Sequence, residues 1–268
     1  MQVAAITNGN VSNASGMGAS RSYPGLLWIE NDHNPGGNND VYLYDTTGTE
    51  RAAFSVTGAT NRDWTDMSIA AGPDSGTNYF YLANIGNSNA LNEDSYIYRF
   101  PEPNTPLTST GEIQGATAAV DRISFIYPNG PRDAETILVD PQSKDIYIFD
   151  KYNLANVYYL PYPQSTDTVI TAKEIITNMP FDGPIRSGGI APNRSEIILK
   201  SYTSIYRFTI NPGQSILSAL ATNTPSNIPY LGEYQGEAMC YTPDGNAFWT
   251  TSKFNLNNFA DLDRYIRK

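Results

Sequence analysis

Hydrophobic and polar residues alternate in short runs through most of the chain. Phrases such as "RAAFSVTG", "DRISFIYP" and "SIYRFTIN" combine Tyr, Ile, Val and Phe with polar residues at a period of two. This is the pattern of β-strands with one buried face. The best candidate for a helix, residues 215–222, is short. The pattern therefore predicts an all-β protein.

A longer repeat organises these strands. Five segments read strand, turn, strand: "SGMGASRSYPGLLWIEND", "DWTDMSIAAGPDSGTNYFYLAN", "DAETILVDPQSKDIYIFDK", "RSGGIAPNRSEIILKS" and "QGEAMCYTPDGNAFWTTSK". Four of the turns begin at Pro73, Pro141, Pro192 and Pro243, followed by residues that tolerate turn angles. Third and fourth strands follow the first four hairpins, and a third strand follows the last. Such units are typical of the blades of a β-propeller.

The number of copies predicts five blades of four antiparallel strands in one domain, residues 1–268. Taking Met17, Thr65, Glu135, Gly188 and Glu237 as equivalent gives spacings of 48, 70, 53 and 49 residues. Six blades are the alternative, because the longest gap has room for one more. The last copy has only three strands, so we expect residues 3–7 to complete it and close the ring with residues 236–253.

The composition and net charge exclude several classes of ligand and partner. The chain has 17 Lys and Arg against 27 Asp and Glu, a net charge of −10, which disfavours nucleic acid and anionic membranes. One cysteine, Cys240, and one histidine, His33, exclude an internal disulfide and a multi-histidine zinc site. No run is long and apolar enough for membrane insertion. Many Tyr, Asn, Thr, Ser and Gly favour an extracellular or periplasmic monomer whose signal peptide has been removed.

Charged residues open the innermost strands. In "GPRDAETILVDP" three charges precede the apolar run, which places them at one mouth of the axial channel. Equivalent positions and the ends of second strands extend this polar ring. The predicted ligand-binding residues are Asp32, His33, Asp63, Trp64, Arg132, Asp133, Lys151, Arg186 and Gln235. The alternative is structural, because Arg and Asp at blade junctions also tie neighbouring blades together.

Glu135 and Glu237 share one register and are predicted to face the axis. Two carboxylates in one channel repel each other unless a cation or proton lies between them. Calcium is the candidate cation, because it accepts carboxylate and carbonyl oxygens in flexible geometry. A water-filled channel with two solvated carboxylates is the alternative.

The histidine, one tryptophan and the third-strand tyrosines each fit two different roles. His33 lies on the predicted mouth face and titrates near neutral pH, but it also fits an exposed loop without a role. Trp64 fits either a contact at the mouth or a wedge between blades. The tyrosines of the third strands fit packing between blades better than a surface for stacking sugars; they are Tyr42, Tyr44, Tyr96, Tyr98, Tyr158 and Tyr159.

The phrases "GLLWIEND", "TGATNRDWTDMSIAAGP", "IYRFPEP", "YPNGPRDAETILVDP" and "QGEAMCYTPDG" resemble a group of exported, poorly characterised bacterial β-propeller proteins. A more distant similarity is to SMP-30/NHL-like and esterase-like phytase propellers. The resemblance implies the fold and matches Glu135 and Glu237. The chain departs from the family pattern at Thr65, Asn84 and Asn87, where the family has acidic residues. Five-bladed apyrases with calcium in the channel are a further analogy of fold.

These observations support three hypotheses. The first is a secreted propeller that binds a small polar ligand, such as a glycan, or a cation at the channel mouth. The second is a calcium-assisted hydrolase of a phosphate ester or lactone. The third is a structural surface protein. No nucleophile elbow, P-loop or metalloprotease motif is present in the sequence.

Overall fold

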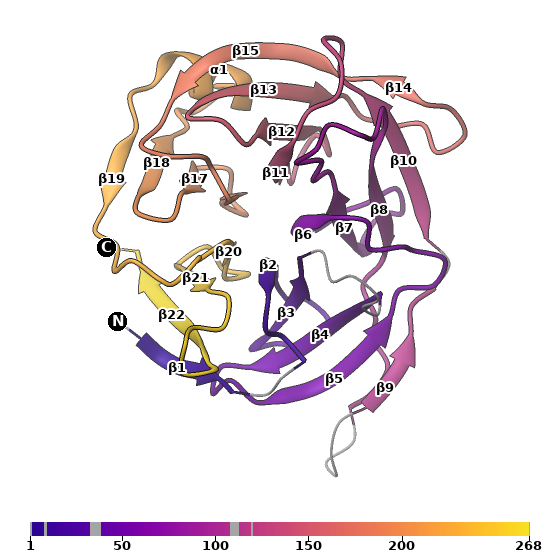
Figure 1. The fold of residues 1–268 in the computed structure, drawn as a ribbon, viewed down its shortest axis with the longest axis vertical. Helices are drawn as coiled ribbons and strands as arrows, with labels where there is room; N and C mark the ends of the chain where they lie inside the picture. Colours follow the sequence, from indigo (N-terminus) through magenta and orange to yellow (C-terminus); the bar gives the residue numbers. More distant parts are fainter. Residues whose placement is uncertain (1, 8–9, 33–38, 108–112, 119, 268) are drawn as a thin grey trace.

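The computed structural model describes residues 2–7, 10–32, 39–107, 113–118 and 120–267. Its strands form five sheets arranged around a central axis (Figure 1). The predicted five-bladed β-propeller is therefore confirmed, and the six-blade alternative is wrong. One helix, α1 (Ile216–Thr222), occurs in the described ranges. No helix in these ranges is long and apolar enough to cross a lipid bilayer.

Each blade begins with its innermost strand and pairs outward in antiparallel order. Blade 1 contains β2 (Ala14–Ala19), β3 (Leu26–Asn31), β4 (Asp40–Asp45) and β5 (Glu50–Ser55). Blade 2 contains β6 (Trp64–Ala71), β7 (Asn78–Asn84), β8 (Ser95–Pro101) and β10 (Asp121–Ile126). Blade 3 contains β11 (Ala134–Val139), β12 (Ile146–Asp150), β13 (Leu154–Leu160) and β15 (Lys173–Pro180).

The last two blades differ in how the fourth strand is supplied. Blade 4 contains β16 (Ser187–Ile190), β17 (Glu196–Lys200), β18 (Ile205–Thr209) and β19 (Ser226–Ile228). Blade 5 contains β20 (Ala238–Tyr241), β21 (Ala247–Thr251) and β22 (Ala260–Ile266), with β1 (Gln2–Ile6) outside them. Because β1 pairs antiparallel with β22, the predicted closure of the ring by the N-terminal strand is confirmed.

The outer edges of two blades are covered by chain from the following blade. The β8–β10 connection adds β9 (Ile113–Ala116) parallel to β5, and the β13–β15 connection adds β14 (Ile170–Thr171) parallel to β10. The β18–β19 connection contains α1, whose Ile216, Ala219 and Leu220 join the cluster between blades 3 and 4. Blades 1 and 2 thus have five strands, which corrects the prediction of four antiparallel strands for every blade.

Aromatic and aliphatic side chains fill the spaces between blades. Between blades 1 and 2, the Trp28 ring lies 5.5 Å from that of Phe54 and 5.1 Å from that of Phe80, both edge to face. Trp64 is fully buried in the same cluster. The third-strand tyrosines named above are buried too, apart from Tyr159, which is half-buried. Packing between blades is therefore the role that the structure gives them.

A bulge near the start of the innermost strands sets the axial register. Pairing shifts by one residue between Ala14 and Gly16, between Trp64 and Asp66, and between Ala134 and Thr136. Aligning the strand pairs on this shift makes one residue of each blade equivalent. The equivalent residues are Ser15, Thr65, Glu135, Arg186 and Glu237. The sequence alignment was therefore wrong by two positions at Met17 and Gly188.

Candidate functional site

Seven charged side chains form an alternating row at the mouth where the innermost strands begin. We call this row the crescent; its members, in order, are Asp133, Lys151, Glu135, Arg186, Glu237, Lys253 and Asp32. At its centre, Arg186 Nη1 lies 3.3 Å from Glu135 Oε1 and 3.5 Å from Glu237 Oε1. Lys151 Nζ contacts Glu135 and lies 3.8 Å from Asp133. The crescent thus crosses blades 3, 4, 5 and 1.

The other arm of the crescent is built around a second lysine. Lys253 Nζ lies 2.7 Å from Glu237 Oε2 and 2.7 Å from Asp32 Oδ2. Tyr202 donates its hydroxyl to Glu237. Asp32 and Lys253 follow the ends of β3 and β21, and these ends pair with the starts of β2 and β20. Second-strand ends and first-strand starts therefore meet at one mouth, as the sequence predicts.

Burial and neighbouring charges compete in the crescent. Burial raises the pKa of Glu135 to about 7, although the cations of Lys151 and Arg186 act in the opposite direction. Burial also lowers the pKa of Lys253, but the carboxylates of Glu237 and Asp32 outweigh it, and the net shift is upward. The lysine is therefore firmly charged, whereas Glu135 exchanges a proton near neutral pH.

Two buried acidic residues lie near the crescent, on the channel side of blades 1 and 2. Glu30 accepts a 2.9 Å hydrogen bond from Ser15 Oγ, and burial raises its pKa to about 8. Asp66 accepts from Ile137 N–H at 2.9 Å and from Ser187 Oγ at 3.0 Å. Burial raises the pKa of Asp66 well above its ordinary value. Asp66 thereby joins blades 2, 3 and 4.

Room for Glu30 depends on a glycine. A Cβ atom at Gly16 would lie 2.5 Å from Glu30 Oε1 and 2.6 Å from the backbone nitrogen of Met67. Glu30 and Asp66 are not among the predicted site residues. The signal was present in "WIEND" and "DWTDMS", where an acidic residue interrupts an apolar strand, since such a residue needs buried partners.

A buried lysine and glutamate were also missed. Lys200 Nζ lies 3.4 Å from Glu233 Oε2 and 5.0 Å from the centre of the Tyr230 ring, and it donates to Gly236 O. Burial lowers the pKa of Lys200 and raises that of Glu233. This pair attaches blade 4 to the segment that leads into β20. Its role is structural, because the Lys200 side chain has no exposed surface.

A polar cavity of about 180 Å³ adjoins the Asp133 end of the crescent. Its lining consists of Arg62, Asp63, Gly86, Asn87, Ser88, Asn89, Leu91 and Asn92. Asn87 N–H donates to Asp133 Oδ1 at 2.7 Å, and Asn87 Nδ2 donates to Asn92 O at 2.9 Å. The cavity wall is thus fixed to blade 3 and presents amide, hydroxyl and carboxylate groups.

The remaining predicted residues fall in different places. Trp64 is a buried wedge between blades and does not reach the mouth. Arg132 acts electrostatically on Asp150 and Tyr158, between blades 2 and 3, and makes no ion pair with Glu135 in the described ranges. Gln235 is exposed. His33 lies outside the described residues.

Two of the residues that depart from the pattern of the resembled family, Asn84 and Asn87, hold neighbouring backbone groups. Asn84 Oδ1 accepts from the N–H groups of Arg62 and Asp63 at 3.0 and 2.9 Å. Asn87 organises the cavity wall, as described above. An amide is required at Asn87, because a carboxylate lacks the N–H donor that Asn87 uses. Asn84 uses only its oxygen, which a carboxylate would also supply.

Comparison with known proteins adds no assignment: no family model matches the chain, and neither does any curated protein. Within the residues that the structure describes, no three His, Cys, Asp or Glu side chains are grouped to hold a metal ion. The calcium site and the family resemblance stay predictions.

Proposed function

We propose that the protein binds a small neutral polyhydroxylated ligand, of the sugar or polyol class, in the polar cavity beside the crescent. The observation that carries this proposal is the cavity lining, where Asp63, Asn87, Ser88, Asn89 and Asn92 surround about 180 Å³. Hydroxyl groups both donate and accept, and amide and carboxylate side chains offer complementary partners.

The crescent favours a neutral ligand. Its four carboxylates alternate with three cationic groups that contact them. A charged ligand would have to displace one of these pairs and leave a partly buried charge without its partner, which is unfavourable. A sugar hydroxyl instead adds hydrogen bonds to groups such as Lys151, which keeps 30% of its side chain exposed.

Ligand-observed NMR tests the proposal directly. The probes are glucose, galactose, N-acetylglucosamine and myo-inositol, each recorded by saturation transfer from the protein. We expect binding by at least one probe and a loss of about tenfold or more in affinity for Asp63→Ala, since hydrogen bonds to charged groups contribute about 1.5–3 kcal/mol. Asp167→Ala is the matched control, because Asp167 is exposed and does not line the cavity.

Two outcomes would reject the binding proposal. One is that no probe receives saturation from the folded protein. The other is that Asp63→Ala and Asp167→Ala bind the probe equally well. Either result would favour the structural interpretation, in which the crescent only ties blades 3, 4, 5 and 1 together.

A calcium-assisted hydrolase is the second candidate, supported by the proton that Glu135 exchanges near pH 7. It requires calcium to bridge Glu135 and Glu237, where Arg186 now contacts both. Calcium bound only to the folded protein would stabilise it by about 2.7 kcal/mol at a hundredfold excess over its Kd. Chelation would then lower the melting temperature, and Glu237→Gln would abolish that effect. Our proposal expects a melting temperature indifferent to chelator and calcium.

We also propose that the protein is exported from the cell and is a monomer. The composition, rich in Tyr, Asn, Thr, Ser and Gly, supports an extracellular or periplasmic protein that meets free sugars or glycans. A monomer is expected, since β1 completes blade 5 within one chain. Fractionation of the native host and light scattering of the purified protein would test these two statements.

A further inference from the structure

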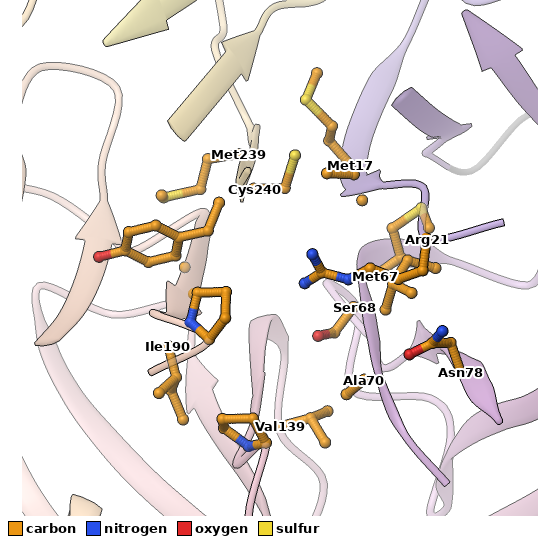
Figure 2. Close-up of a pocket in the computed structure, with 18 of the residues that line it drawn as sticks. Met17, Arg21, Met67, Ser68, Ala70, Asn78, Val139, Ile190, Met239 and Cys240 are labelled. Atoms are coloured by element: carbon orange, nitrogen blue, oxygen red, sulfur yellow. The ribbon is translucent and has the colours of Figure 1, made fainter. Parts of the chain in front are cut away.

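The opposite end of the axial channel holds a second cavity, of about 230 Å³ (Figure 2). Its walls combine apolar side chains with polar groups and come from the innermost strands of all five blades. The apolar lining includes Met17, Met67, Val139, Ile190, Met239 and Cys240. A cavity of this size is below the roughly 300–1,000 Å³ of pockets for drug-sized ligands, so it suits a smaller molecule.

One cationic side chain enters this cavity. Figure 2 shows the Arg21 guanidinium pointing into its middle. Among the described residues, no hydrogen bond or ion pair involves that guanidinium, and Arg21 is the single charged residue in the lining. Burial lowers the pKa of Arg21, but a guanidinium stays protonated at neutral pH. Arg21 is half-buried and its nitrogens are not among the fully buried polar atoms, so the cation is accessible to an anionic ligand.

The backbone that carries Arg21 is fixed by a carboxylate that makes no hydrogen bond to the guanidinium, although its charge acts on it. Glu102 accepts from the N–H groups of Arg21, at 3.0 and 3.2 Å, and Ser22, at 3.1 Å. It also accepts from Ser20 Oγ at 2.6 Å and from Trp28 Nε1 at 2.8 Å. Glu102 is buried, with 6% of its surface exposed. This turn therefore presents Arg21 on a preorganised support.

We propose that this cavity binds a small monocarboxylate with an apolar tail, whose carboxylate pairs with Arg21. A guanidinium matches a carboxylate through two parallel hydrogen bonds, and the methionine side chains adapt to an aliphatic tail. A phosphate dianion fits less well, because the described lining supplies no second cation. This site is independent of the sugar site, since it lies at the other end of the channel.

Methionine methyl NMR provides a specific test. Met17, Met67 and Met239 line the cavity, whereas Met179 is on β15 in the outer part of blade 3. With ¹³C-methyl methionine, titration with hexanoate should shift the three cavity signals and leave Met179 unchanged. Hexan-1-ol, which has the same tail without the charge, should bind about tenfold or more weakly, because it forms no charge-assisted pair with Arg21.

Arg21→Gln should weaken hexanoate binding by about tenfold or more and leave hexan-1-ol binding unchanged. Arg51→Gln is the matched control: Arg51 is 42% exposed on blade 1, in a surface pair with Asp45. The dispersed signals of the variants report whether they fold. Equal binding of acid and alcohol, unchanged hexanoate binding in folded Arg21→Gln, or no shift of the three cavity signals would overturn the proposal.

Discussion

The buried carboxyl of Glu30 makes stability depend on pH in a defined direction. Its ordinary pKa of 4.5 rises to about 8 in the folded protein because of burial. Between these values the folded state holds a proton that the unfolded state releases. Stability therefore falls as pH rises from about 4.5 and levels off above about 8. Glu30→Gln removes this dependence, because the amide is neutral at every pH.

The size of the effect follows from the shift. A difference between 4.5 and about 8 corresponds to about 5 kcal/mol once the carboxyl is ionised in both states. About 4 kcal/mol of it should develop between pH 5 and pH 9. Glutamine can still accept the hydrogen bond from Ser15 Oγ. The variant should therefore gain stability over the wild-type protein as pH rises.

Urea unfolding at several values between pH 5 and pH 9 measures this difference. Other groups, such as Glu135 and Asp66, titrate in both proteins, so the informative quantity is the variant minus the wild type. Glu93→Gln is the control, because Glu93 is exposed, and its difference should stay near zero. A Glu30→Gln difference that does not change with pH would refute the argument that Glu30 is held protonated.

Two further predictions concern the crescent and the ring closure. Arg186→Met should destabilise the protein by about 1.5–3 kcal/mol in urea unfolding at pH 8, because Glu135 and Glu237 lose their shared cation and keep only Lys151 and Lys253. A loss below 1 kcal/mol would mean that water already screens the two carboxylates. Deleting residues 1–7 should expose the edge of β22 and promote self-association, measured by light scattering. A deletion variant that stays monomeric with unchanged stability would contradict a structural role for β1.

The internal repeat of the sequence made it possible to predict the five-bladed fold. Alternating strands and four proline turns defined the hairpins, and the three-stranded last copy indicated the pairing of β1 with β22. The parallel strands β9 and β14 were not predicted. β9 has four residues and β14 has two, too few to show an alternation of apolar and polar residues. Such a short segment becomes a strand because it pairs with the outer strand of the neighbouring blade.

The site was predictable only in part, for a reason visible at Arg186. Local alternation cannot reveal a bulge, and the bulge decides which residue of each blade is axial. Glu135 and Glu237 were placed correctly relative to each other, but Gly188 was taken as their equivalent in place of Arg186. The pairing of Arg186 with both glutamates then follows from three-dimensional register. Trp64 shows the same limit, since burial between blades depends on the neighbouring sheet.

The covering of blades 1 and 2 by strands from the following blade has a consequence for synthesis. A chain leaves the ribosome from its N-terminus, and exposed strand edges invite wrong association. The edge of β5 stays uncovered until β9 has emerged, and that of β10 until β14 has emerged. β1 remains without its partner longest, because β22 is the last of the described strands to be synthesised. A nascent chain therefore carries an unmatched first strand throughout translation, and two such chains that exchange it would emerge as an intertwined dimer.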